Sequence, residues 1–79
     1  MQNYYIKVVD RRGQKLYEGE TSAVSEHEAE NNALWRYAMT KIPNELSNEV
    51  KTIKARKLIK EFRSTGIKAI ADTYDEFPM

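Results

Sequence analysis

The sequence contains no cysteine and no apolar run long enough to cross a membrane. Small secreted domains usually depend on disulfides, so the absence of cysteine favours a reducing, intracellular compartment. The first residues, Met1–Tyr5, lack the basic and then apolar stretches of a signal peptide. A membrane-spanning helix needs about 20 apolar residues, and no segment approaches that length. We therefore expect a cytoplasmic protein without a membrane partner.

Residue types that usually perform catalysis or bind metals are also scarce. His27 is the single histidine, and in the absence of cysteine a metal site would depend on carboxylates. Glu26, Glu28 and Glu30 are spaced by two, which does not place all three on one helix face. The three glycines are isolated, so there is no glycine-rich phosphate loop. We expect no enzyme activity, no metal and no cofactor.

Charge is present in quantity but is divided unevenly along the chain. The formal net charge is only +1, which is weak support for a dedicated nucleic-acid-binding protein. The early acidic residues are Glu18, Glu20, Glu26, Glu28 and Glu30. The later basic residues are Lys51, Lys54, Arg56, Lys57, Lys60, Arg63 and Lys68. Any basic surface must therefore be local, and the segment 51–68 is its candidate.

The first half of the chain predicts a hairpin followed by a helix. Residues 4–9 are rich in β-branched and aromatic side chains and predict a strand. Residues 10–13 predict a turn that ends in Gly13, after which residues 15–21 return as a second strand. Gly19 is a candidate bulge position. Ser25 and Glu28 form the pattern of a capping box, in which Ser25 accepts from the Glu28 N–H and the Glu28 side chain returns to the N–H of Ser25.

The predicted helix carries two apolar stripes. It should run from 26 to about 41, because Pro43 disfavours helical geometry at the residue before it. One broad side, which contains Ala29, Ala33, Leu34, Tyr37 and Ala38, should pack on the hairpin. The other side carries Trp35, Met39 and Ile42. We expect this second stripe to be covered by the C-terminal segment or by another molecule.

Residues 50–62 fit two structures. A helical spacing is present at Ala55, Leu58, Ile59 and Phe62. Val50, Thr52 and Ile53 instead favour a strand. Because an isolated hairpin is marginal in water and needs a third strand or good helical cover, we predict a strand here, with a helix as the alternative. In the strand, Lys54, Arg56 and Lys60 would share one face.

The predicted fold is therefore α+β. A small antiparallel sheet, made of the N-terminal hairpin and a third strand at about 50–60, is packed by one helix at about 26–41, in the order β-β-α-β. A helical or extended tail follows, and the helical alternative depends on the spacing of Ile67, Ile70, Ala71 and Tyr74. The chain of 79 residues is expected to form one domain, 1–79, with residues 72–79 frayed.

Part of the chain resembles known proteins. A pattern of Tyr-x-Ile-x-Val, then Gly13, then Ser-x-x-Glu-Ala leading into an Ala/Leu/Tyr helix resembles that of many short phage or mobile-element proteins. The order of hairpin and helix is also similar to that of integrase arm-binding domains, which have three strands before the helix. The resemblance covers about half of the chain and assigns no function to any residue.

Two binding functions remain. The first expectation is a non-enzymatic accessory or regulatory protein, of phage or mobile-element type, that binds another protein or a second copy of itself through Trp35, Met39 and Ile42. The alternative is a nucleic-acid-binding module that uses the basic segment 51–68. The residues expected to bind nucleic acid in that alternative are Arg11, Arg12, Lys54, Arg56 and Lys60.

Overall fold

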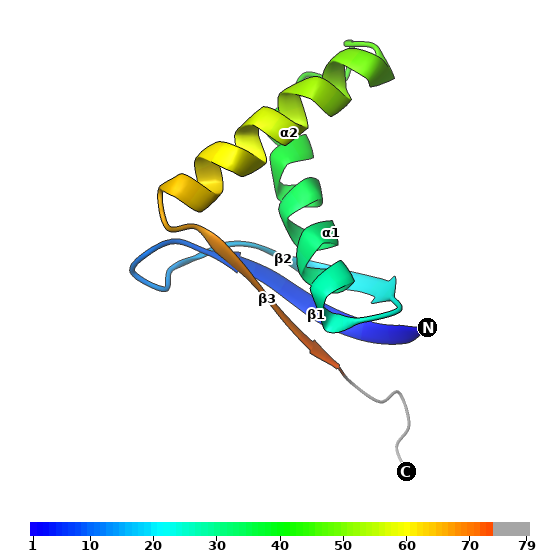
Figure 1. The fold of residues 1–79 in the computed structure, drawn as a ribbon, viewed down its shortest axis with the longest axis vertical. Helices are drawn as coiled ribbons and strands as arrows, with labels where there is room; N and C mark the ends of the chain where they lie inside the picture. Colours follow the sequence, from blue (N-terminus) through cyan, green and yellow to red (C-terminus); the bar gives the residue numbers. More distant parts are fainter. Residues whose placement is uncertain (74–79) are drawn as a thin grey trace.

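The computed structural model describes residues 1–73 and shows a three-stranded antiparallel sheet with two helices (Figure 1). The elements, in chain order, are β1 (Gln2–Val9), β2 (Lys15–Ala23), α1 (Glu26–Met39), α2 (Asn48–Ser64) and β3 (Lys68–Thr73). The strand order in the sheet is β2-β1-β3, so the first strand lies in the centre. The predicted α+β class is confirmed, while the chain order is β-β-α-α-β instead of β-β-α-β.

The hairpin of β1 and β2 forms where the sequence predicts it. Its turn is held by the Asp10 carboxylate, which accepts the backbone N–H of Arg12 at 2.8 Å and that of Gln14 at 2.9 Å. Gly13 has a φ of 85°, a left-handed conformation that glycine adopts without steric cost. The irregularity in pairing lies between Val8 and Val9, not at the predicted Gly19.

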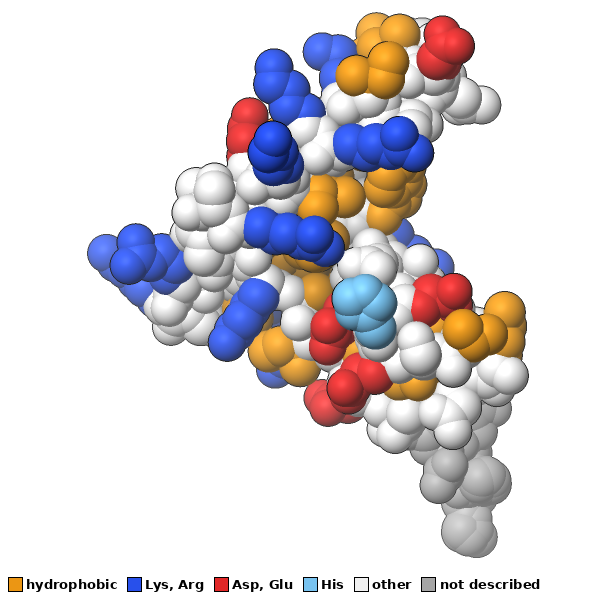
Figure 2. Space-filling model, viewed as in Figure 1, with side chains coloured by type: hydrophobic (Ala, Val, Ile, Leu, Met, Phe, Trp, Pro, Cys, Tyr) orange, Lys and Arg blue, Asp and Glu red, His pale blue; other side chains and the backbone are white. Residues whose placement is uncertain are grey.

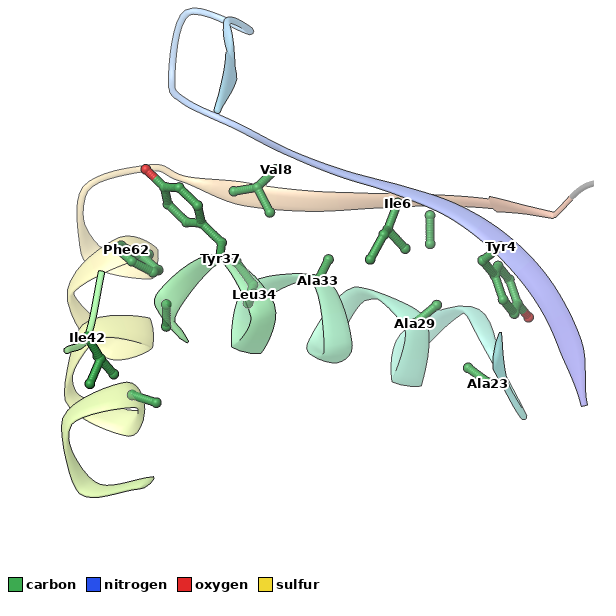
Figure 3. Packing of buried hydrophobic residues seen from close by; sticks show 13 residues of the cluster. Tyr4, Ile6, Val8, Ala23, Ala29, Ala33, Leu34, Tyr37, Ile42 and Phe62 are labelled. Atoms are coloured by element: carbon green, nitrogen blue, oxygen red, sulfur yellow. The ribbon is translucent and has the colours of Figure 1, made fainter. Parts of the chain in front are cut away.

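Helix α1 begins at the predicted cap and covers one face of the sheet. Ser25 Oγ accepts the Glu28 N–H at 3.1 Å, as predicted. The Glu28 carboxylate accepts from the N–H of Val24 at 3.0 Å, one residue before the predicted partner. The small side chains of Ala29 and Ala33 face the sheet and let the helix approach it closely (Figure 3).

The prediction of a third strand at 50–60 is wrong, because this segment is the middle of α2. A second cap initiates the helix: Ser47 Oγ accepts the N–H of Val50 at 3.3 Å. Ala55 and Phe62 are buried, whereas Val50 and Ile53, the residues that favoured a strand, are exposed. The helical alternative in the sequence was therefore correct. Figure 1 shows α2 crossing the end of α1 and extending beyond the sheet, and α1 is its main packing partner.

Of the two alternatives predicted for the tail, helical or extended, the described part adopts the extended one, because Lys68–Thr73 form β3 and pair with β1. Helix α2 ends in a Schellman motif, in which the N–H of Ile67 donates to Phe62 O and that of Gly66 to Arg63 O. Gly66 has a φ of 87° and reverses the chain toward the sheet. Asp72 and Thr73 thus belong to a strand, and the remaining residues of the segment expected to fray, 74–79, lie outside the described residues.

One cluster of buried residues joins both helices to all three strands. Tyr4, Ile6 and Val8 of β1 point toward α1 (Figure 3). Tyr37 of α1 lies at the meeting point of the layers, with its ring centroid 5.0 Å from that of Phe62 on α2 and 6.3 Å from that of Tyr17 on β2. Through Ala55 and Phe62, this cluster holds one side of α2 against the rest of the molecule. The opposite side of α2 stays uncovered.

Candidate functional site

The stripe of Trp35, Met39 and Ile42 is not an exposed unit. Ile42 is only 7% exposed and belongs to the core. Trp35 and Met39 are half-buried at the margin of the same core. The described part of the C-terminal segment is the edge strand β3 instead of a helix laid over this stripe. Two of the three predicted contact residues therefore keep some exposed surface, and the third does not.

The outward side of α2 is defined by its geometry. Successive residues of an α-helix are rotated by about 100°, so the side opposite Ala55 and Phe62 can be identified directly. It carries a row of residues at helical spacing, all of them exposed, which we call the outer row: Ile53, Lys57, Lys60 and Ser64. This row points away from α1.

Cations flank the outer row on both sides. Arg56 and Arg63 lie on one flank, and Lys54 lies on the other, next to Glu61. The prediction that Lys54, Arg56 and Lys60 share one face is therefore wrong, because that alignment required a strand. In the helix, Lys60 is in the outer row, and Lys54 and Arg56 lie on opposite sides of it.

The hairpin tip brings two further cations to the same surface. Arg11, Arg12 and Thr65 line a shallow hollow between the β1–β2 turn and the connection from α2 to β3. The Arg11 side chain lies so close to Gly66 that a Cβ atom there would overlap its Cγ. Arg11 and Arg12 thus lie beside the C-terminal end of α2.

We call the exposed cations of α2 and of the hairpin tip, taken together, the basic ridge. Its members are Arg11, Arg12, Lys54, Arg56, Lys57, Lys60 and Arg63, and all seven are exposed. Figure 2 shows Lys and Arg side chains along α2 and at the hairpin end, whereas acidic side chains gather around the start of α1. Basic and acidic side chains are therefore concentrated on different parts of the molecule, although its net charge is only +1.

The cations of the basic ridge are not neutralised from within. No ion pair inside residues 1–73 involves a member of the basic ridge, and the pair of Lys15 and Glu18 lies on β2. Arg63 donates a hydrogen bond to the Asn31 Oδ1 at 3.3 Å, which is an uncharged partner. Asp10 lines the same hollow as Arg11 and Arg12, and Glu49 and Glu61 lie on α2. The seven cations of the basic ridge outnumber these three carboxylates, so an external anion would meet a net positive potential.

An apolar side chain lies among these charges. Ile53 is 63% exposed at the start of the outer row, and Val50, one turn before it, is 38% exposed. A large β-branched residue with this exposure in the middle of a helix gains little from the core, since its burial on folding is small. Sequence reasoning counted Ile53 only as a strand-forming residue and missed it as part of a surface.

The opposite face of the sheet offers a second hollow, of different character. Tyr5 is 52% exposed there, and its register partners are Glu20 on β2 and Asp72 on β3. Of the three tyrosines of the hairpin, Tyr4 is buried and Tyr17 is half-buried in the core. The neighbouring carboxylates make this face unfavourable for phosphate.

Within residues 1–73, no group of His, Cys, Asp and Glu is arranged to hold a metal ion. No helix in that part of the chain is both long and apolar enough to span a bilayer. No protein-family model, curated protein or solved structure matches the chain.

Proposed function

We propose that this protein is a non-enzymatic nucleic-acid-binding module and that the basic ridge is its contact surface. The carrying observation is that Arg11 and Arg12 lie beside the C-terminal end of α2, the helix that carries the other exposed cations, although they are distant from it in sequence. Phosphate backbones are bound by clustered Lys and Arg side chains, whose affinity depends on the release of condensed counterions.

The low net charge of the chain does not argue against this function. Helix α2 alone carries six Lys or Arg and two Glu, so the acidic excess lies in other elements. Exposed charges farther apart than about 8–10 Å are largely screened at physiological salt. The potential that a phosphate meets at the basic ridge is therefore set mainly by the cations nearest to it.

The test is fluorescence anisotropy with a labelled DNA duplex of mixed sequence, at several salt concentrations. If six phosphates are contacted, affinity should fall by about a thousandfold between 50 and 200 mM salt. Arg56→Gln combined with Lys60→Gln should weaken binding and lower the slope of log K against log salt by about two.

Lys7→Gln is the matched control, because it removes one cation from β1, in the hollow on the opposite face of the sheet. It should leave both the affinity and the salt slope close to those of the parent protein. Equal effects of Lys7→Gln and of a single substitution in the basic ridge would contradict the proposed surface. Absence of binding at low salt would contradict the function itself.

A protein partner is the second candidate function, and the half-buried pair Trp35 and Met39 favours it. Both residue types are enriched at protein interfaces. With Ile42 in the core, however, this patch is smaller than the sequence suggests. A second copy of the chain is one possible occupant. Protein binding becomes the preferred function if the anisotropy experiment shows no binding of DNA at low salt.

A further inference from the structure

We propose that α2 enters the major groove of duplex DNA and that Ile53 contacts thymine methyl groups there. The inference rests on the proposed function and specifies both its ligand and the part of the basic ridge that reads the ligand. It follows from the shape of α2, from the side chains absent from its surface, and from the exposure of Ile53.

The shape of α2 fits the groove. An α-helix with its side chains is about 10–12 Å across, and the major groove of B-form DNA is about 12 Å wide. Helix α2 packs mainly on α1 and extends beyond the sheet, so its outer row is not shielded by the strands (Figure 1). The row from Ile53 to Ser64 is about 16 Å long.

The distribution of charge around α2 fits the two walls of the groove. Lys54 on one flank and Arg56 and Arg63 on the other are placed to reach phosphates of opposite strands, while the outer row faces the base edges. Within that row, Lys57 and Lys60 can donate to the O6 and N7 acceptors of guanine. Contacts to phosphates would fix the register, and contacts to base edges would supply the sequence preference.

Other nucleic acids fit this surface less well. Binding of single strands depends on aromatic side chains that stack with bases, and the only aromatic residue of α2, Phe62, is buried. Tyr5, the exposed tyrosine of the hairpin, lies on the other face of the sheet beside carboxylates. The major groove of an RNA duplex is too deep and narrow for side chains to read.

Ile53 has a specific role in this arrangement. The C5-methyl group of thymine is the one apolar feature of the major groove, and apolar side chains contact it. Ile53 is the most exposed apolar residue of α2 and lies in the outer row itself, with Lys57 one turn after it. A surface meant only for phosphates gains nothing from an isoleucine at this position.

The experiment compares two duplexes of alternating A and T that differ only in the methyl group, one with thymine and one with deoxyuridine. At low salt, the parent protein should bind the thymine duplex about fourfold tighter for each methyl contact. Ile53→Ser should bind both duplexes equally. Val24→Ser is the matched control, because Val24 is also exposed but precedes α1, and it should keep the preference. Circular dichroism should show unchanged helix content in both variants.

Equal affinity of the parent protein for the two duplexes, or an unchanged preference in Ile53→Ser, would overturn the inference. Tighter binding to a single DNA strand or to an RNA duplex of the same length would overturn it as well. Each of these results retains salt-sensitive binding by the basic ridge and so leaves the proposed function intact. Failure to bind any of the probes at low salt would refute the proposed function as well.

Discussion

At the scale of single residues, Gly66 is the glycine at which an added side chain meets the most resistance. Its φ of 87° favours glycine, and a Cβ atom would overlap Arg11 Cγ and lie 2.8 Å from Arg11 Cδ. Gly13 has a similar φ of 85° but nothing within 4 Å of its Cβ position. A comparison of alanine substitutions at the two glycines therefore distinguishes the cost of backbone strain, which both share, from the cost of a steric clash, which only Gly66 has.

Gly66→Ala should lower the free energy of unfolding by more than Gly13→Ala does. Each substitution places alanine in a left-handed conformation, which costs about 1–2 kcal/mol. Gly66→Ala must also displace Arg11, so its cost should exceed that of Gly13→Ala by a measurable margin in urea denaturation. Arg11→Ala in the Gly66→Ala background should remove this difference. Equal costs for the two glycine substitutions would show that Arg11 moves away freely.

At the scale of elements, the two helices begin with the same type of cap but differ in their packing. Ser25 starts α1, which packs along the sheet from its first turns, whereas Ser47 starts the part of α2 with the exposed Val50 and Ile53. Where packing is sparse, the cap contributes a larger share of local stability. The first turn of α2 should therefore depend strongly on Ser47.

Ser47→Ala should increase amide hydrogen exchange over residues 48–52 and lower the free energy of unfolding by about 1 kcal/mol, because the Val50 N–H loses its acceptor. Ser47→Asp is the rescue control, since aspartate also caps and favours the positive end of the helix dipole. If exchange over these residues is unchanged in Ser47→Ala, the cap is not what holds this turn.

The elements also show what local sequence could predict. The hairpin and α1 are predicted correctly because their signals are local: the turn with Gly13, and the cap at Ser25. The third strand was needed for a stable sheet, but its position could not be read locally, since β3 is defined by pairing with β1. Ala69 and Ala71 face the core from β3, and small residues carry a weak strand signal.

The candidate site was predictable in composition but not in geometry. The cations of 51–68, with Arg11 and Arg12, are visible in the sequence as a local basic excess. Their arrangement depended on whether 50–62 is a strand or a helix, and the exposed Val50 and Ile53 favoured the wrong choice. Residues on a surface are not selected for burial, so their strand propensity says little about the backbone there.

At the scale of the whole molecule, charge of one sign is concentrated on one helix. Lys54, Lys57 and Lys60 follow one another at spacings of three, and like charges at this spacing repel by a few tenths of a kcal/mol per pair. The free protein therefore carries repulsion along the basic ridge that a bound polyanion or dissolved salt would relieve.

The free energy of unfolding should consequently rise by about 1 kcal/mol when sodium chloride is raised from about 20 to about 500 mM. The measurement is thermal unfolding followed by circular dichroism across this range. Lys57→Gln combined with Lys60→Gln should reduce the salt effect, whereas Lys7→Gln should retain it. A salt effect of the same size in all three proteins would place its origin outside the basic ridge.

The sheet order β2-β1-β3 has a consequence for how the chain folds. The central strand acquires its first neighbour through a short turn, but its second neighbour arrives only after both helices, with Val9 facing Lys68. Closing so long a loop costs chain entropy that only the assembled core can offset. The sheet is therefore completed only by β3. During synthesis the hairpin can pair early, while β1 keeps an unpaired edge until residues 68–73 have left the ribosome.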